Sequence, residues 1–234
     1  MHAWQVLVAA LIGGAAAVER KGALQLMLSR PLPLGALLGY ALGDARGGLL
    51  VGLPLELLFL GAVNLGAALP DNETIATSCA ATAAVLAGRL LGMRTVDAPL
   101  ALMAIALFLP VAIIGRRLER ISEGLNLLLA RHAVEDIAGH ERAVIRAHVR
   151  GLFAPFIVGA LAAGLAAVLA TALAFIRYDL DPRLARGLEA GWVCLLGVSG
   201  AAAVRAIRDP RAPYFAAAGA GAIALAVGLL KVLR

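Results

Sequence analysis

Charge is scarce in this 234-residue chain, because only 15% of its residues are Asp, Glu, Lys or Arg. Soluble domains have about a quarter of charged residues and about half of apolar residues, whereas here 62% are hydrophobic. Cysteine is also scarce. Cys79 and Cys194 stand alone in apolar runs, without the spacing of a metal site or a CxxC motif. We therefore exclude a soluble domain and expect both cysteines to be small core residues.

The sequence also lacks the signatures of catalysis. It contains no Walker motif, no GxGxxG, no HExxH and no paired-carboxylate phosphotransferase signature. The GVSG sequence at 197–200 matches the GxSG motif around the nucleophile of intramembrane serine proteases. That chemistry needs a histidine base on a neighbouring span, and the four histidines all lie outside the expected spans. We expect no catalytic residue, no metal site and no cofactor on this chain.

The long apolar runs predict a polytopic membrane protein. A transmembrane helix needs about 20 apolar residues, so the length leaves room for about six to nine transmembrane or re-entrant helices. Alternation of polar and apolar residues is missing, which favours helices over a β-barrel. We therefore expect an all-α, multi-pass protein with one membrane-embedded domain over 1–234. The clearest helical runs are 3–18, 74–92, 96–115, 151–176, 187–207 and 213–230.

The formal net charge of +6 comes from arginines at the ends of apolar runs. This placement favours contact with membrane lipid headgroups and disfavours binding of nucleic acid. The segment 116–150 is different, because it has seven arginines, five acidic residues and apolar residues at helical spacing. We expect it to form one or two amphipathic helices on the cytoplasmic side.

The segment 22–73 is interrupted and is expected to form broken or re-entrant helices. Proline and glycine divide it, and Arg30-Pro31-Leu32-Pro33 should stop any helix, because proline lacks the N–H. The preceding residues 22–30 are expected to form a short amphipathic segment. Ala45-Arg46-Gly47 and Ala185-Arg186-Gly187 both lead into glycine-interrupted apolar runs, which suggests an internal repeat of the kind that builds transporters.

The polar residues of 47–74 are the candidate site. Glu56 lies inside an apolar run, where a carboxylate is costly and usually functional, unless an arginine pairs with it. Asn64 is about two helical turns further on, and an amide can both donate and accept hydrogen bonds from sugar hydroxyls. Asp71, Asn72 and Thr74 mark a helix start, with Asp71 or Asn72 as the N-cap. They are either caps or ligands in the same cavity.

These residues resemble the IIC permease subunit of mannose-family phosphotransferase systems, which act on mannose, fructose, sorbose and N-acetylgalactosamine. The first similarity is Leu28-Ser29-Arg30-Pro31-Leu32, followed by Gly39-Tyr40-Ala41-Leu42-Gly43-Asp44. A more specific one follows in Gly52-Leu53-Pro54-Leu55-Glu56-Leu57, Asn64-Leu65-Gly66-Ala67-Ala68 and Pro70-Asp71. The C-terminal third is similar only in its glycine-rich pattern.

The resemblance implies a sugar-translocating subunit in the bacterial inner membrane. It implies an oligomeric complex with a IID membrane subunit and with IIA and IIB phosphocarrier proteins, which carry the phosphorylated histidines. Glu56, Asn64 and Asp71 match the motif and would bind the sugar hydroxyls, and Asn72 and Thr74 would do so by proximity. The sugar itself is not specified.

Two other functions fit the residues alone. An ion- or proton-coupled transporter would use Glu56 as its titrating group, and its uptake would need a proton gradient but no phosphoenolpyruvate. A membrane scaffold or receptor subunit would bind partners and move no solute.

Overall fold

A computed structural model describes residues 2–61, 69–135, 141–214 and 216–217, with side chains of 132–144 left undescribed. In these residues every regular element is an α-helix, as the sequence predicts. Eight helices follow in order: α1 (Ala3–Glu19), α2 (Pro31–Leu42), α3 (Ala45–Phe59), α4 (Glu73–Leu90), α5 (Ala98–Phe108), α6 (Val111–Glu135), α7 (Glu141–Tyr178) and α8 (Pro182–Ala206). Asn64 and most of the expected last helix lie outside the described residues.

Three described stretches are long and apolar enough to cross a membrane: Ala98–Arg131, Ile145–Tyr178 and Pro182–Ala206. The helices Ala3–Glu19 and Pro31–Leu42 are apolar but shorter. The prediction of an all-α, multi-pass membrane protein is therefore confirmed. The internal repeat and the single-domain assignment stay predictions.

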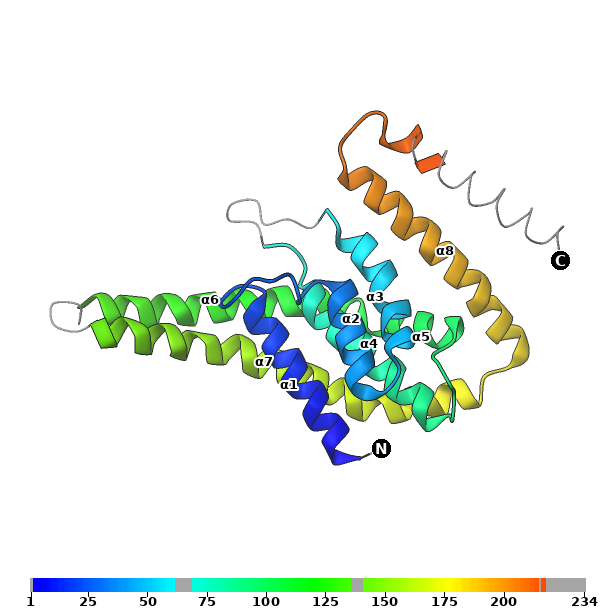
Figure 1. Ribbon diagram of the computed structural model, residues 1–234, viewed down its shortest axis with the longest axis horizontal. Helices are drawn as coiled ribbons and strands as arrows, with labels where there is room; N and C mark the ends of the chain where they lie inside the picture. The colour runs from blue at the N-terminus through cyan, green and yellow to red at the C-terminus, as the bar shows by residue number, and fades with distance from the viewer. Residues whose placement is uncertain (1, 62–68, 136–140, 215, 218–234) are drawn as a thin grey trace.

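Helix α4 lies at the centre of the described helices (Figure 1), where α2, α3, α5 and α7 pack around it. Every residue from Glu73 to Gly88 is buried. Asn72 is its N-cap and accepts a hydrogen bond from the Ile75 N–H at 3.0 Å, as the sequence predicts. Small alanine, serine and threonine side chains let neighbouring helices approach α4 from all sides.

Helices α2 and α3 form a tight hairpin. The turn is at Gly43, whose φ of +93° suits glycine, and Asp44 caps α3 by accepting from the Gly47 N–H. A Cβ on Gly35 would lie 2.6 Å from the carbonyl oxygen of Gly48, so the two backbones are in direct contact. The broken or re-entrant arrangement expected for 22–73 stays a prediction.

Several local expectations were wrong. Arg30-Pro31-Leu32-Pro33 does not stop a helix, because Pro31 is the first residue of α2, where the missing N–H costs nothing. Residues 22–30 have no helix, and Leu24, Gln25 and Met27 have positive φ. Pro54 lies inside α3 without ending it.

Cys79 is buried as expected, but Cys194 is exposed, because α8 packs on the other helices with one side only.

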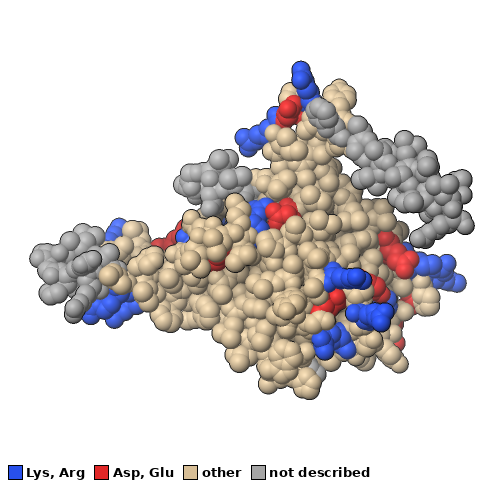
Figure 2. Space-filling model, in the orientation of Figure 1, with Lys and Arg blue, Asp and Glu red and all other residues tan. Residues whose placement is uncertain are grey.

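The segment 116–150 contributes to a long arm. Helices α6 and α7 lie side by side and extend beyond the other helices (Figure 1). Pro110 lies between α5 and α6, within the stretch Ala98–Arg131 that is long and apolar enough to cross a membrane. Figure 2 shows that charged side chains are sparse over the body on this face, and that Lys and Arg gather towards the arm tip and other helix ends. This distribution fits an apolar body surrounded by lipid.

Candidate functional site

Charged side chains converge where α1 ends and α4 and α6 pass. Arg20 donates to Glu73 at 2.8 Å and to Glu119 at 2.6 Å, and all three side chains are at most 9% exposed. Burial lowers the pKa of the Arg20 guanidinium, but the charges and hydrogen bonds of Glu73 and Glu119 outweigh burial and raise it above its ordinary value. Arg20 therefore stays charged and fixes two carboxylates.

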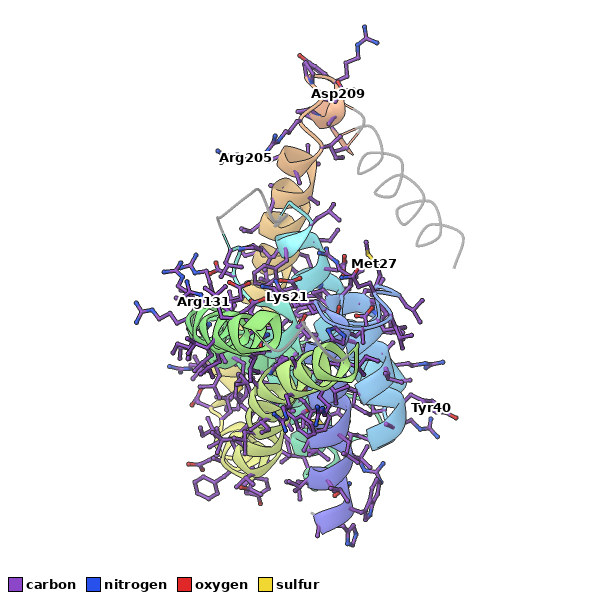
Figure 3. All side chains as sticks on the ribbon, turned by 90° about the vertical axis from the view of Figure 1, so that its left-hand side faces the viewer. Lys21, Met27, Tyr40, Arg131, Arg205 and Asp209 are labelled. Carbon is purple, nitrogen blue, oxygen red and sulfur yellow. The ribbon has the colours of Figure 1, made fainter. Side chains whose placement is uncertain are left out.

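Lys21 extends this cluster towards the arm. Its ammonium group lies 2.6 Å from Glu119 and also pairs with Glu123, one turn further along α6. Figure 3, which looks along the arm, shows Lys21 beside this helix pair, whereas Arg131 points outward. The carboxylate of Glu119 is thus held between two cations, with both cations on the segment that follows α1.

Asn72 connects the start of α4 to this cluster. Its side-chain oxygen caps α4, and its amide nitrogen donates to Glu119 at 3.2 Å. Asn72 is 5% exposed, so both polar ends of the side chain have partners in a buried setting. One amide hydrogen remains for a ligand, because the amide group has two.

Glu56 has an arginine partner, one of the two possibilities that the sequence left open. Arg30 donates to its Oε1 from Nε at 3.0 Å and from Nη2 at 2.6 Å, and the Leu32 N–H donates to Oε2 at 3.1 Å. The pair joins the start of α2 to α3. Arg30 also lies 3.9 Å from Glu73, which links Glu56 to the Arg20 cluster.

The remaining predicted residues have separate places. Thr74 is fully buried and donates to the Ser29 carbonyl at 3.1 Å. Asp71 is partly exposed and lies 3.2 Å from Arg116. Asn64 lies outside the described residues. The structure therefore brings Asn72 and the backbone carbonyl of Asp71 to the Arg20 cluster directly, and Glu56 and Thr74 to its immediate surroundings.

A cavity of about 470 Å³ opens beside the cluster, between the end of α1, the start of α4, and helices α6 and α7. Its volume is in the range of small-molecule sites. Apolar walls come from Ile75, Leu118 and Leu152. Its principal polar lining residues are Arg20, Asn72, Glu119, Ser122, Asn126 and His148.

The sequence did not single out Arg20, Glu73 or Glu119 as site residues. Glu19-Arg20-Lys21 has the pattern of a water boundary, and Glu119 is one of many charges in 116–150. In the sequence, the one sign that Glu119 is buried is its position next to Leu118, at the apolar start of the segment. The pairing across 99 residues is a tertiary property.

Two solved structures share this fold. One, titled a structure of a membrane protein, superposes with a TM-score of 0.68 over 100% of this chain and 97% of its own, at 20% identity. The other, titled a cryoEM structure of the mannose transporter ManYZ in complex with microcin E492, gives a TM-score of 0.62 over 100% and 96%, at 21% identity.

Curated sequences are similar over part of the chain. The mannose-specific EIIC component of Escherichia coli K12 is 32% identical over 144 residues, which are 58% of this chain and 50% of that protein. A putative N-acetylgalactosamine permease IIC component 2 of the same strain is 39% identical over 61 residues, or 26% of this chain and 46% of its own. The chain thus matches about half the length of these relatives.

The family model for the sorbose-specific IIC component of phosphotransferase systems matches residues 3–195, which include seven of the helices completely and the first half of α8. The match includes the hairpin, the Arg20 cluster and all of the predicted site residues. The chain belongs to the sorbose-specific IIC family of phosphotransferase-system components.

Proposed function

We propose that this chain is the sugar-translocating membrane subunit of a phosphotransferase system in the bacterial inner membrane. Family membership and the multi-pass helices support this role. The observation that carries it is the cavity of about 470 Å³ next to Asn72 and Glu119. A transported sugar needs a site that offers hydrogen bonds within a largely apolar enclosure, and this cavity offers both.

The sugar would bind between a polar and an apolar wall. Glu119 would accept a hydrogen bond from a sugar hydroxyl with the lone pair that Arg20, Lys21 and Asn72 leave free. Asn72 would donate its second amide hydrogen. The apolar walls at Ile75 and Leu118 would contact the C–H faces of the sugar ring. Because Arg20 and Lys21 fix Glu119, the site would be preorganised and lose little side-chain entropy on binding.

The residues singled out from the sequence take supporting roles in this proposal. Glu56 and Arg30 would hold the hairpin against the cluster through Glu73, and Thr74 would fix the segment at Ser29. Asp71 and Asn64 would contact the sugar from the segment that precedes α4. Asn64, Asp71, Asn72 and Glu119 would thus contact the sugar, and Glu56 and Thr74 would hold the surrounding segments in place.

Partner proteins would supply the chemistry. A IID subunit would join the chain in the membrane, and IIA and IIB proteins would phosphorylate the sugar as it emerges. Similarity to a solved mannose transporter supports such a complex. Helices α7 and α8 expose large apolar side chains, including Leu161, Phe175 and Val193, which suits contact with lipid or with another membrane subunit.

The test is sugar uptake by membrane vesicles that contain the chain with matching IID, IIA and IIB proteins. Radiolabelled mannose, sorbose and N-acetylgalactosamine are supplied in turn, with and without phosphoenolpyruvate. We expect at least one to accumulate as its phosphate, only with phosphoenolpyruvate. Uptake that needs a proton gradient instead would identify a coupled transporter. Binding of partners with no solute movement would identify a scaffold.

Glu119→Gln tests the site within this assay. The variant keeps the shape but loses the charge that Arg20 and Lys21 fix, so uptake should fall by about tenfold or more, as for a lost charged hydrogen bond. Glu189→Gln is the matched control, because Glu189 is exposed on α8 far from the cavity lining. Equal uptake by the two variants would exclude Glu119 from the sugar site.

A further inference from the structure

Helix α4 carries buried hydroxyl groups that lack partners. Thr77, Ser78 and Thr82 are each 0% exposed, and none of the three finds a hydrogen-bond partner among the described residues. An unpaired buried hydroxyl costs free energy, so such groups need an explanation. Three such hydroxyl groups occur within six residues of the central helix, and close packing alone does not require hydroxyl groups at these positions.

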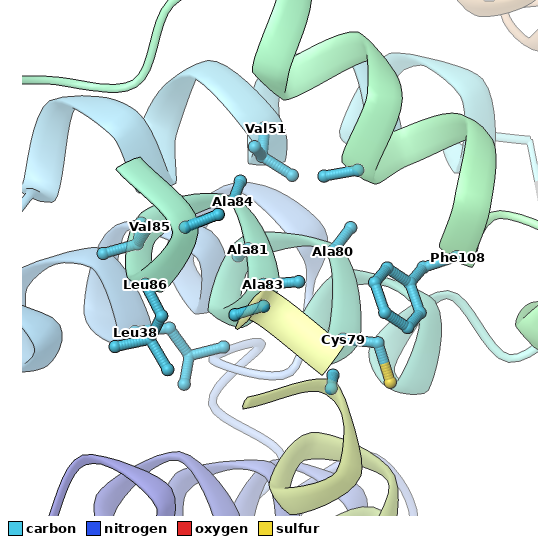
Figure 4. Packing of buried hydrophobic residues seen from close by; sticks show 14 of the residues in the cluster. Leu38, Val51, Cys79, Ala80, Ala81, Ala83, Ala84, Val85, Leu86 and Phe108 are labelled. Atoms are coloured by element: carbon cyan, nitrogen blue, oxygen red, sulfur yellow. The ribbon is translucent and has the colours of Figure 1, made fainter. Parts of the chain in front are cut away.

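The hydroxyl groups share one side of α4. At about 100° per residue, four of them fall within an arc of about 140°: Thr74, Thr77, Ser78 and Thr82. Four alanines fall within about 60° on the opposite side: Ala76, Ala80, Ala83 and Ala87. Figure 4 shows Ala83 beside the yellow-green ribbon of α7. The alanine side therefore packs on α7, and the hydroxyl side faces away from it.

The hydroxyl side faces the α2–α3 hairpin. Thr74 donates to the Ser29 carbonyl just before α2, and Arg89 donates to the Leu42 carbonyl at its end, at 3.0 Å. Figure 4 shows Leu38 of α2 next to Leu86, one turn after Thr82. It also shows Val51 of α3 near Ala84. Apolar side chains of the hairpin thus cover this side of α4.

The hairpin is joined more closely within itself than to α4. Besides the Gly35–Gly48 contact, a Cβ on Gly52 would lie 2.5 Å from the Pro31 carbonyl oxygen, so α2 and α3 pack backbone to backbone. Towards α4 it has the two terminal hydrogen bonds, the contact of 3.9 Å between Arg30 and Glu73, and buried leucine side chains. A movement of the hairpin relative to α4 would therefore carry α2 and α3 together and break few polar contacts.

We propose that the hydroxyl stripe of Thr74, Thr77, Ser78 and Thr82 is a sugar-contacting surface, which is exposed when the α2–α3 hairpin moves away from α4. The inference rests on the proposed function. Each hydroxyl can donate to and accept from a sugar hydroxyl, which would supply the partner that Thr77, Ser78 and Thr82 lack in this conformation. The stripe begins two residues after Asn72 but lies on the side of α4 away from α7, so it would add a second polar surface to the cavity that α6 and α7 line.

Single-cysteine variants test the exposure. Ser78→Cys and Thr82→Cys are made with Cys79→Ala and Cys194→Ala, and the Cys194→Ala protein, which keeps only Cys79, is the control. Cys79 is 2% exposed on another side of the same helix turn. Full-length protein in membrane vesicles with its partners is treated with a small cationic methanethiosulfonate reagent, with and without saturating mannose, sorbose or N-acetylgalactosamine.

We expect the cysteine at 82 or 78 to react at least about tenfold faster than Cys79, because exposure controls thiol reactivity. The transported sugar should slow that reaction. Equal reactivity of all three positions in protein that still transports would overturn the inference. Fast labelling that no transported sugar slows would also overturn it, because the surface would then face water alone.

Thr82→Val provides a second measurement, because valine has nearly the shape of threonine without the hydroxyl. Removing an unpaired hydroxyl should leave the unfolding temperature unchanged or raise it, while maximal uptake falls by a factor of about 3 to 10, as for one lost hydrogen bond. A lower unfolding temperature with unchanged uptake would show a structural hydroxyl instead. Failure of the proposed function would appear separately, as absent uptake by the unmodified protein.

Discussion

The Arg20 guanidinium lies 2.6 Å from the Glu119 carboxylate and joins the end of α1 to α6 across 99 residues of sequence. Both side chains are 9% exposed, and Arg20 holds Glu73 of α4 at the same time. Three helices that contact the proposed sugar cavity are therefore fixed by one cation. The cluster acts as the structural support of the site and also supplies part of its polar lining.

Arg20→Met should destabilise the protein strongly. It leaves the carboxylates of Glu73 and Glu119 buried without their shared partner, which costs about 3–5 kcal/mol. Thermal unfolding in detergent measures the effect. Arg205→Gln is the control, because Arg205 lies near the far end of α8 (Figure 3). If both variants unfold at the same temperature, the cluster does not stabilise the fold.

Replacements of Asn72 separate its two roles. Asn72→Ala should lose about 0.5–2 kcal/mol, because the N-cap of α4 is lost, whereas Asn72→Ser keeps a capping oxygen and most of the stability. Both variants lack the amide that reaches Glu119, so both should lose sugar uptake. Unfolding temperature and uptake are measured on the same preparations. Normal uptake by the serine variant would limit Asn72 to capping.

Glu56→Gln tests the first residue that the sequence singled out. The change removes the charge that Arg30 contacts twice and leaves Arg30 with its longer contact to Glu73. We expect reduced phosphoenolpyruvate-dependent uptake and a modest loss of stability, about 1–3 kcal/mol for hydrogen bonds to a charged group. The measurement is initial uptake rate against sugar concentration. An unchanged rate and affinity would remove Glu56 from the proposed site.

Gly35→Ala should separate α2 from α3. The added Cβ would meet the Gly48 carbonyl oxygen at 2.6 Å, and overpacking of this kind costs about 1–3 kcal/mol. Gly197→Ala is the matched control, because its Cβ would meet nothing within 4 Å and alanine favours the helix. The unfolding temperature should fall for the first variant and stay or rise for the second. A fall in both would contradict the close backbone contact.

Local patterns in the sequence predicted the helices well where one physical rule dominates. The apolar runs predicted the spans. The polar residues just before Glu73 predicted the N-cap of α4, because a capping hydrogen bond joins residues only three positions apart. The expectation at Pro31 failed because proline is compatible with the first position of a helix, and α2 begins there. Residues 22–30 form no helix, and Ser29 instead donates to Glu19 and accepts from Thr74, two contacts that the local sequence does not predict.

The sequence by itself determined that this is an apolar, all-helical membrane protein with polar residues concentrated before α4. Its family resemblance also came from local motifs. Only the tertiary structure decided that Arg20 pairs with Glu73 and Glu119, that Arg30 pairs with Glu56, and that the hydroxyl side of α4 is covered by the hairpin. Such pairings depend on how distant helices pack, and no local spacing rule encodes which buried charges will meet.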